Sequence, residues 1–174
     1  MILVGLDPSF SCAGVSVMDT EKKEIRISDS RETIGKRKSF ENVFKASLRT
    51  HQNIRDIFDM VDVKPDYLLS EKPYSGGQFS SGLHTLDGTL FLDLIYRYKS
   101  LQKVFLITSR FLSHVHSQNN VKDYSKSDST KLAREGLLPI FEEYGYDIEY
   151  GIKVSLKGGL NNNTAESFIF LSPL

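Results

Sequence analysis

Three acidic residues that lie far apart in the sequence occupy positions from which their side chains can meet. Asp7 and Glu71 each end an apolar run, and Glu166 lies in the first turn of the predicted last helix. Each therefore marks the tip of an element of the core. Carboxylates gathered without partner cations repel one another, and a divalent metal ion relieves that repulsion. The pattern predicts a metal site of the kind that carries out phosphodiester chemistry.

The elements that carry these residues favour a common site. Open α/β sheets build their sites beyond the carboxyl ends of central strands, which is where Asp7 and Glu71 are expected to lie. A helix that crosses this edge with Glu166 completes a cage for metal. Two ions about 3.5–4 Å apart clamp the attacking and leaving oxygens of an in-line displacement. We therefore expect these three residues to be the metal ligands of a hydrolytic site.

The chain is predicted to begin with three strands. Residues 2–7 are apolar almost throughout, as in a central strand, whereas residues 13–18 and 24–28 alternate between apolar and small or polar side chains. A polar turn over residues 19–23 separates the second strand from the third. These segments predict a three-stranded antiparallel meander.

Helices and further strands follow the meander. Apolar residues at helical spacing predict a long amphipathic helix over residues 39–61, followed by the strand that ends at Glu71. The remaining predictions are a helix over 85–101, a strand over 104–107, polar sequence to 127, a helix from 127 that Pro139 kinks or divides, an extended segment over 148–156 and a last helix from 163. The order predicts an α/β fold with a mixed five-stranded sheet, the meander plus parallel strands, flanked by helices.

Length and composition limit the class of protein. The 174 residues fit one domain over 1–174, and 40% hydrophobic with 25% charged residues is ordinary for a soluble globular protein. The one cysteine, Cys12, excludes an intramolecular disulfide and indicates a reducing, cytoplasmic compartment. No apolar run is long enough for a bilayer, so we expect no membrane partner. The net charge of +0 argues against a protein that coats nucleic acid through nonspecific electrostatic attraction. It does not argue against a nuclease, because bound metal ions would bring positive charge to a carboxylate site.

Three segments of the chain carry short motifs in a fixed order. They are Gly5-Leu6-Asp7-Pro8-Ser9 with Gly14-Val15 on the next strand, then Glu71, and then Asn163-Thr164-Ala165-Glu166-Ser167-Phe168. With these residues the sequence resembles the RuvC family of Holliday junction resolvases, within the RNase H-like superfamily. The last segment is similar to the closing D-x-A-D-[AS] motif of that family. The resemblance implies an RNase H-like fold and a homodimer that cleaves four-way DNA junctions with two Mg²⁺ or Mn²⁺ ions per active site.

The resemblance also assigns roles outside the carboxylates. Tyr74, in a Gly/Ser-rich loop, matches an aromatic residue that inserts at the unstacked centre of a junction, and Phe79 in the same loop is a second candidate. Lys126 resembles a catalytic lysine near the scissile phosphate, with Lys131 as the alternative. The basic residues expected to contact DNA are Lys122, Lys126, Lys131 and Arg134.

Two residues depart from the closing motif. Asn163 stands where the first acid is expected, and it offers a carbonyl oxygen to a metal ion but no charge. Glu166 stands where aspartate is usual, which moves the carboxylate outward by one methylene group. The resemblance implies that Asn163 supports the metal site as a neutral ligand or that it marks an inactivated enzyme.

Each acid also has a purely structural interpretation. Asp7 before Pro8 is ordinary turn chemistry, and Glu71 is acceptable as a surface acid at the end of a strand. Asn163-x-x-Glu166 has the spacing of a capping box, in which the glutamate only accepts a backbone N–H. The metal site would be excluded only if all three structural interpretations were correct.

Three functions remain open from the sequence. The first is a metal-dependent, structure-selective DNA endonuclease that hydrolyses four-way junctions, forks or flaps. The second is a branched-DNA-binding protein of the same fold in which Asn163 has weakened or abolished cleavage. The third is a nucleotide-binding protein of the actin-like superfamily, whose opening strand also carries Gly-x-Asp. A compact resolvase of this kind fits a phage or viral origin, in which case it would act in the cytoplasm of the host cell.

Overall fold

The structure is a computed structural model that describes most of the chain. The described residues are 1–9, 12–29, 43–60, 64–72, 80–118, 125–155 and 159–172. Among their helices, none combines the length and the apolar character that a membrane span requires.

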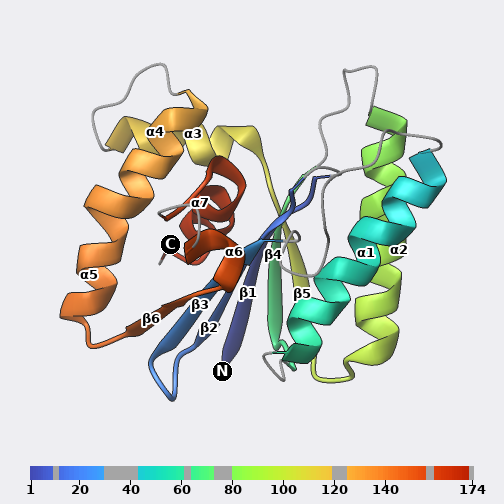
Figure 1. The fold of residues 1–174 in the computed structure, drawn as a ribbon, viewed down its shortest axis with the longest axis horizontal. Coiled ribbons are helices and arrows are strands. Elements are labelled where there is room, and N and C mark those ends of the chain that lie inside the picture. Colours follow the sequence, from blue (N-terminus) through green and yellow to red (C-terminus); the bar gives the residue numbers. More distant parts are fainter. Residues whose placement is uncertain are drawn as a thin grey trace.

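A six-stranded mixed sheet forms the centre of the described fold, in the order β5-β4-β1-β2-β3-β6. β1 (Ile2–Asp7), β2 (Gly14–Asp19) and β3 (Glu24–Asp29) form the predicted antiparallel meander. β4 (Tyr67–Glu71) pairs parallel with β1, and β5 (Lys103–Ile107) pairs parallel with β4. In Figure 1, β1 rises from the N-terminus, so the carboxyl ends of β1, β4 and β5 meet at the upper edge of the sheet.

The sixth strand distinguishes this sheet from the predicted five-stranded one. β6 (Asp147–Tyr150) pairs parallel with β3 at the edge of the sheet, within the segment predicted to be extended. The chain then turns into the short helix α6 (Ile152–Ser155) instead of continuing as a strand. Because β6 has only four residues and lies at an edge, its sequence has too little alternation to reveal its pairing.

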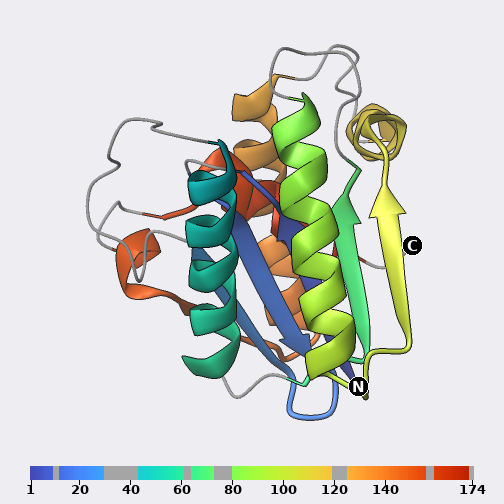
Figure 2. The same ribbon diagram turned by 90° about the vertical axis from the view of Figure 1, so that its right-hand side faces the viewer.

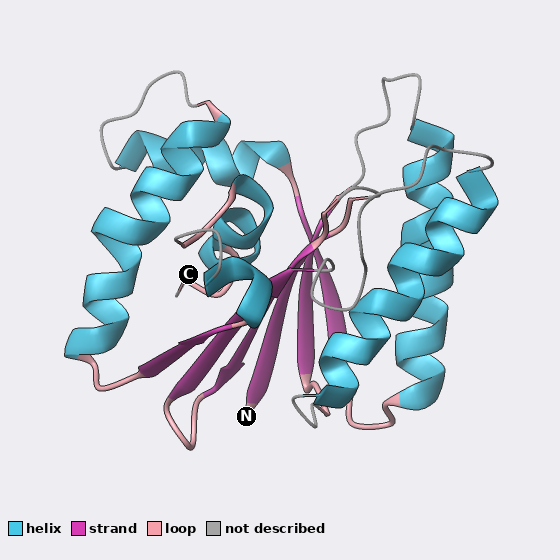
Figure 3. Ribbon diagram, in the orientation of Figure 1, coloured by secondary structure: helices cyan, strands magenta, loops and turns pink. Residues whose placement is uncertain are grey.

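Helices cover both faces of the sheet (Figure 3). The further helices, in chain order, are α1 (Val43–Met60), α2 (Ser80–Arg97), α3 (Ser109–Gln118), α4 (Lys126–Lys131), the π-helical turn η1 (Leu132–Leu137), α5 (Leu138–Glu143) and α7 (Asn162–Ile169). α1 and α2 lie on one face, and the other helices pack against the opposite face (Figures 1 and 2). The fold therefore has three layers, with one hydrophobic core on each side of the sheet.

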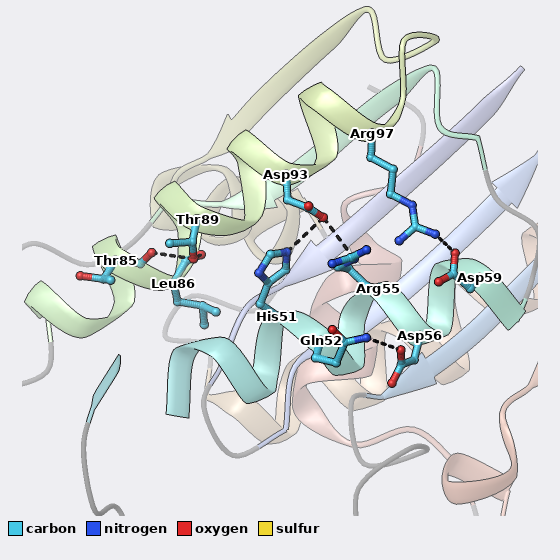
Figure 4. A network of polar contacts seen from close by, with 10 residues as sticks. All are labelled: His51, Gln52, Arg55, Asp56, Asp59, Thr85, Leu86, Thr89, Asp93 and Arg97. Carbon is cyan, nitrogen blue, oxygen red and sulfur yellow. Dashed lines mark hydrogen bonds and ion pairs between the residues drawn. The ribbon is translucent and has the colours of Figure 1, made fainter. Parts of the chain in front are cut away.

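Polar contacts join α1 to α2 in addition to their apolar packing (Figure 4). Asp93 on α2 lies 3.2 Å from His51 Nε2 and 3.3 Å from Arg55 Nε, both on α1, within ion-pair distance but without hydrogen-bond geometry. Arg97 of α2 also pairs with Asp59 of α1. These contacts fix the alignment of the two helices along the sheet.

The alternation of side chains along β1 and β4 places Asp7 and Glu71 on the same face of the sheet. Leu6 and Leu68 belong to the core under α1 and α2, whereas Leu69 packs against the core on the opposite face. Successive side chains of a strand point to opposite faces. Asp7 follows Leu6, and Glu71 lies two residues after Leu69. Both carboxylates therefore project toward the face that α7 covers, at the carboxyl edge of the sheet.

The helix around Pro139 is continuous but contains a π-helical turn. α4, η1 and α5 follow one another from Lys126 to Glu143. The N–H of Leu138 donates to the carbonyl of Ala133, five residues earlier, as in a π-helix. Pro139 has no N–H and cannot continue the ordinary helical pattern. The predicted interruption therefore takes the form of a wider turn and not of two separate helices.

Two other helices differ from their predictions. α3 occupies sequence that predicts only a polar, irregular segment, because Phe111, Leu112 and Val115 are its few apolar residues. Leu112 is nevertheless buried in the core, which stabilises a helix whose other positions are mostly polar. α2 begins at Ser80 and not near Thr85. The predicted start of α1 at residues 39–42 lies outside the described residues.

Candidate metal centre

Asp7, Glu71 and Glu166 converge at the carboxyl edge of the sheet, as predicted. One oxygen from each carboxylate lies within 4.8 Å of one from each of the other two. Asp7 and Glu71 are neighbours because β1 and β4 are parallel and Leu6 is in register with Ser70. Glu166 comes from α7, which packs across β1 and β2. Three distant parts of the sequence therefore supply one cluster.

The cluster has the chemistry of a site for a hard divalent cation. Asp7 and Glu166 are only 4% and 7% exposed, and Glu71 is half-buried. Two like charges at this separation repel by about 3 kcal/mol at an effective dielectric constant of about 20. Oxygens on opposite sides of a bound Mg²⁺ ion lie roughly 4.2 Å apart, so small side-chain adjustments suffice. The donor set is all oxygen, which Mg²⁺ and Mn²⁺ prefer.

Two glycines allow α7 to reach the cluster. A Cβ atom added to Gly5 on β1 would lie 1.9 Å from the carbonyl oxygen of Ser167, and one added to Gly14 on β2 would lie 2.0 Å from that of Asn163. Only a residue without a side chain permits such close backbone contact. The sequence motif around Gly5 and Gly14 therefore has a steric basis: it makes room for the helix that carries Glu166.

The residues that cap the N-terminus of α7 are not the pair Asn163 and Glu166 of the capping-box interpretation. Asn161 is the N-cap, and its side-chain oxygen accepts a hydrogen bond from the N–H of Thr164 at 3.1 Å. The Thr164 hydroxyl accepts in return from the N–H of Asn161 at 2.9 Å. Glu166 lies in the second turn of the helix and not in the first. The capping-box interpretation of Asn163-x-x-Glu166 is therefore wrong.

Side-chain hydrogen bonds fix α7 and orient Glu166. The Ser129 hydroxyl of α4, which is fully buried, donates to Glu166 Oε1 at 3.1 Å. Ser16 of β2 and Ser167 of α7 share a buried hydrogen bond of 2.8 Å between their hydroxyls. One contact comes from α4 and the other from the sheet, so the carboxylate has a defined orientation before any ligand binds.

A buried acid of β3 holds the start of α7. Asp29, at the carboxyl end of β3, accepts a hydrogen bond of 3.1 Å at Oδ2 from the amide of Asn161. Asp29 is fully buried. Because Asn161 is the N-cap, this contact ties the first turn of α7 to the sheet.

Asn163 lies on α7 one turn before Glu166 and is half-buried. Residues three apart in a helix share a face, so Asn163 is on the side of α7 that carries the cluster carboxylate. Its backbone carbonyl lies over Gly14. The position agrees with the prediction of a supporting neutral ligand, which stays a prediction.

The predicted DNA contacts are described only in part. Tyr74, Phe79 and Lys122 lie outside the described residues. Lys126 is the first residue of α4, one turn before Ser129, and its side chain lies outside the described part. Lys131 and Arg134 are exposed, and Lys131 Nζ lies 4.0 Å from a carboxylate oxygen of Glu135. Their roles in DNA binding stay predictions.

The sequence analysis did not identify Asp87, a buried acid on α2. Asp87 is 4% exposed, and neither carboxylate oxygen has a hydrogen-bond partner among the described residues. Burial, and then the negative charge of Glu71, raise the pKa of Asp87 to about 7. The one signal in the sequence is an acid inside the apolar stripe Leu86, Leu90 and Leu94.

Comparison with known proteins finds a similar fold at low sequence identity. No family model and no curated protein matches the chain. The structure of Thermus thermophilus RuvC matches with a TM-score of 0.59 at 13% identity, over 98% of this chain and 90% of that chain. T. thermophilus RuvC in complex with Holliday junction substrate matches with a TM-score of 0.47 at 13% identity, over 66% of this chain and 68% of that one. The first of these matches spans almost the whole of both chains, and the chain therefore has a RuvC-like fold.

Proposed function

We propose that the protein is a divalent-metal-dependent endonuclease that cleaves branched DNA. The observation that carries this proposal is the cluster of Asp7, Glu71 and Glu166, whose ligand oxygens lie within 4.8 Å of one another at the carboxyl edge of a RuvC-like sheet. Buried carboxylates at this spacing are suited to divalent cations. Phosphodiester hydrolysis is the reaction that such cations promote when several acids hold them beside a nucleic-acid backbone.

The residues of the centre have distinct tasks in this proposal. Asp7 and Glu71 hold metal from the rigid ends of paired strands, and Glu166 completes the cage from α7, oriented by Ser129. Bound Mg²⁺ or Mn²⁺ would activate water and neutralise charge on the scissile phosphate. Asn163 supports the cage with an uncharged oxygen. Lys126 is proposed to contact the scissile phosphate.

Branched DNA is the proposed substrate because of the loop that follows Glu71. This loop carries Tyr74 and Phe79, which would stack on bases that are unpaired at a branch point. Stacking depends little on base identity, so it suits recognition of DNA structure and not of sequence. Lys122 and Arg134 would contact the DNA backbone beside the centre. Four-way junctions, forks and flaps all present such unstacked positions.

We also propose that the protein acts as a homodimer through the outer face of α2. Leu92, Ile95 and Tyr96 lie at i, i+3 and i+4 on this helix and are 59%, 53% and 81% exposed. Exposed apolar side chains grouped on one helix face are typical of protein interfaces. A symmetric dimer places the same face of both copies in contact, and two active sites suit paired cuts in a junction.

A second candidate function is branched-DNA binding with weak or no cleavage. The observation that favours it is Asn163, which faces the cluster side of α7 but adds no charge to it. A centre with fewer negative charges binds divalent cations less tightly. In that case Asn163→Asp should raise the rate of cleavage sharply.

A cleavage assay separates the two functions. Labelled four-way junction, fork and linear duplex are incubated with the protein in Mg²⁺, Mn²⁺ or EDTA. Metal-dependent, paired nicks confined to the branched substrates would support the endonuclease. Junction binding without nicks would favour the second candidate and call for Asn163→Asp, whereas neither binding nor cleavage would contradict both.

A further inference from the structure

Asp29 is a fully buried acid at the carboxyl end of β3, in line with the first acid of the metal centre. Asp7 pairs with Gly14 across β1 and β2, and Gly14 pairs with Asp29 across β2 and β3. Residues directly opposite each other in antiparallel strands project to the same face, so Asp29 and Asp7 both project toward α7. Neighbouring strands lie about 4.8 Å apart, which places the two acids about 10 Å from each other along the edge.

Asp29 contacts α7 and does not belong to the carboxylate cluster. The oxygens that lie within 4.8 Å of one another come from Asp7, Glu71 and Glu166. Asp29 Oδ2 instead accepts a hydrogen bond of 3.1 Å from the side-chain amide of Asn161, the N-cap of α7. Burial of a carboxylate is costly, but a hydrogen bond to an ionised acceptor is about twice as strong as one between neutral groups. The helix dipole also favours a negative charge at this end of α7.

Polar contacts toward both ends of α7 fix its position, because its closest contacts with the sheet are made over two glycines of β1 and β2. A glycine permits close approach but has no side chain that resists a shift of the helix. Ser16 holds α7 near its end through the hydroxyl of Ser167 at 2.8 Å. Asp29 holds its start through Asn161. The second contact therefore sets where the first turn lies on the sheet.

The first turn of α7 in turn determines where the residues that face the metal centre lie. The side chain of Asn161 joins Asp29 to the helix backbone, because its oxygen accepts from the N–H of Thr164 at 3.1 Å. Asn163 and Glu166 follow this cap along the same helix. A displacement of the cap would therefore move both residues relative to the strands that carry the other ligands.

We propose that Asp29 is a positioning residue of the metal centre, which acts through Asn161 on the placement of α7 and hence of Glu166. The inference rests on the proposed function, because it requires that the cluster binds a divalent cation. It adds a residue that lies outside the sequence motifs and does not itself contact the cation. Small displacements of Glu166 matter, since Mg²⁺ demands nearly ideal octahedral geometry from its ligands.

The test combines calorimetric titration of the full chain with Mn²⁺, without DNA, and amide hydrogen exchange of the metal-free protein. Asp29→Asn keeps the size of the side chain and removes its charge. Asn161→Ser keeps an oxygen for the cap and removes the amide that reaches Asp29. We expect each variant to bind Mn²⁺ about 10-fold more weakly, and the N–H of Thr164 to exchange faster. Because both substitutions affect one contact, the double variant should bind Mn²⁺ about as tightly as either single variant.

Asp19→Asn is the matched control. Asp19 ends β2 in the same meander but at the opposite end of the sheet. Its Oδ1 accepts hydrogen bonds from the N–H groups of Glu21 and Lys22, at 2.9 and 3.1 Å. The Mn²⁺ affinity of this variant should equal that of the wild type, whatever its effect on stability.

The outcomes separate this inference from the function on which it rests. Asp29→Asn and Asn161→Ser that are less stable in urea but bind Mn²⁺ as tightly as the wild type would show that Asp29 only stabilises the fold. Additive losses of affinity in the double variant would also overturn the inference, since the two residues would then act independently. A wild-type protein that binds no Mn²⁺ would contradict the metal centre itself, and with it the role of Asp29. Circular dichroism shows that each variant is folded, and Asn161→Ser alone decides the test should Asp29→Asn fail to fold.

Discussion

At the scale of single residues, Ser129 determines how Glu166 faces the metal centre. Its buried hydroxyl donates to Glu166 Oε1 at 3.1 Å. Ser129→Ala removes this donor and with it one constraint on the orientation of the carboxylate, so we expect the rate of metal-dependent cleavage to fall about 10–100-fold. Thr130→Val is the matched control, because Thr130 donates to Asn162 and not to a cluster carboxylate. A Ser129→Ala rate no lower than that of Thr130→Val would contradict this role.

Asp87 predicts a pH dependence of stability in the absence of metal. Its pKa is about 7 in the folded protein against an ordinary 3.8, so between these values the folded state binds more protons than the unfolded state. The free energy of unfolding should therefore fall as the pH rises through this window. Asp87→Asn removes the cost of burying an ionised carboxylate. The variant should therefore gain at most about 4 kcal/mol in the free energy of unfolding above pH 7 and almost nothing near pH 4.

Urea unfolding in EDTA at several pH values measures this effect. The variant should be more stable than the wild type near about pH 8, and the two should converge near about pH 4. A difference in stability that does not change with pH would show that Asp87 carries no such penalty.

The residues of the metal centre differ in how readily the sequence predicts them. Asp7 and Glu71 are predictable because each ends an apolar run, and the parallel pairing of two such runs places their ends together. Glu166 is predictable through its motif. Ser129, which orients Glu166, is not predictable, because a serine in a polar helix acquires such a role only through tertiary contacts.

At the scale of elements, the close packing of α7 on β1 and β2 depends on two glycines. Gly5→Ala would place a Cβ atom 1.9 Å from the backbone oxygen of Ser167, so α7 must shift. We expect a loss of about 1–3 kcal/mol or more in the free energy of unfolding, together with loss of metal-dependent cleavage. Gly88→Ala is the matched control, since an added Cβ there meets nothing within 4 Å. It should stabilise α2 by up to about 1 kcal/mol.

Urea unfolding of both glycine variants measures the contrast. Equal stabilities for Gly5→Ala and Gly88→Ala would contradict the close approach of α7 to the sheet.

Elements with strong periodicity are predictable, and elements stabilised by distant contacts are not. The meander, β4, β5 and α1 follow from alternation or helical spacing in their own sequences. α3 has few apolar residues, and it is stabilised by the core that Leu112 enters. β6 becomes a strand because the edge of β3 offers hydrogen bonds to it. The start of α7 is set by Asn161, whose partner Asp29 lies on another element.

At the scale of the whole molecule, the carboxylate cluster and a pocket of the described structure lie at opposite ends of the sheet. A cavity of about 450 Å³ lies at the opposite end, near the amino ends of β4 and β5, and is lined by residues that include Phe58, Arg97 and Tyr98. None of the cluster carboxylates lines it. The chemistry proposed for the cluster therefore does not involve this pocket.

The outer face of α2 predicts the oligomeric state. The double substitution Leu92→Glu with Tyr96→Glu puts charges on this exposed apolar face, and we expect a dimer to become a monomer. The dissociation constant should rise at least about 100-fold, because each 1.4 kcal/mol of lost burial is a factor of ten. Tyr144→Glu is the control, since Tyr144 is 68% exposed but lies beyond α5. Sedimentation velocity measures the change, and a wild type that is monomeric at high concentration would contradict the interface.

The most direct test of the metal centre compares the wild type with Asp7→Asn on a four-way junction. The substitution keeps the size of a side chain that is 4% exposed and removes its charge from the cluster. Junction binding and cleavage are measured together, in Mg²⁺ and in EDTA. We expect the wild type to introduce paired nicks in Mg²⁺ alone, and Asp7→Asn to bind the junction equally well without cleaving it. Cleavage by Asp7→Asn at the wild-type rate, or cleavage by the wild type in EDTA, would contradict the metal centre.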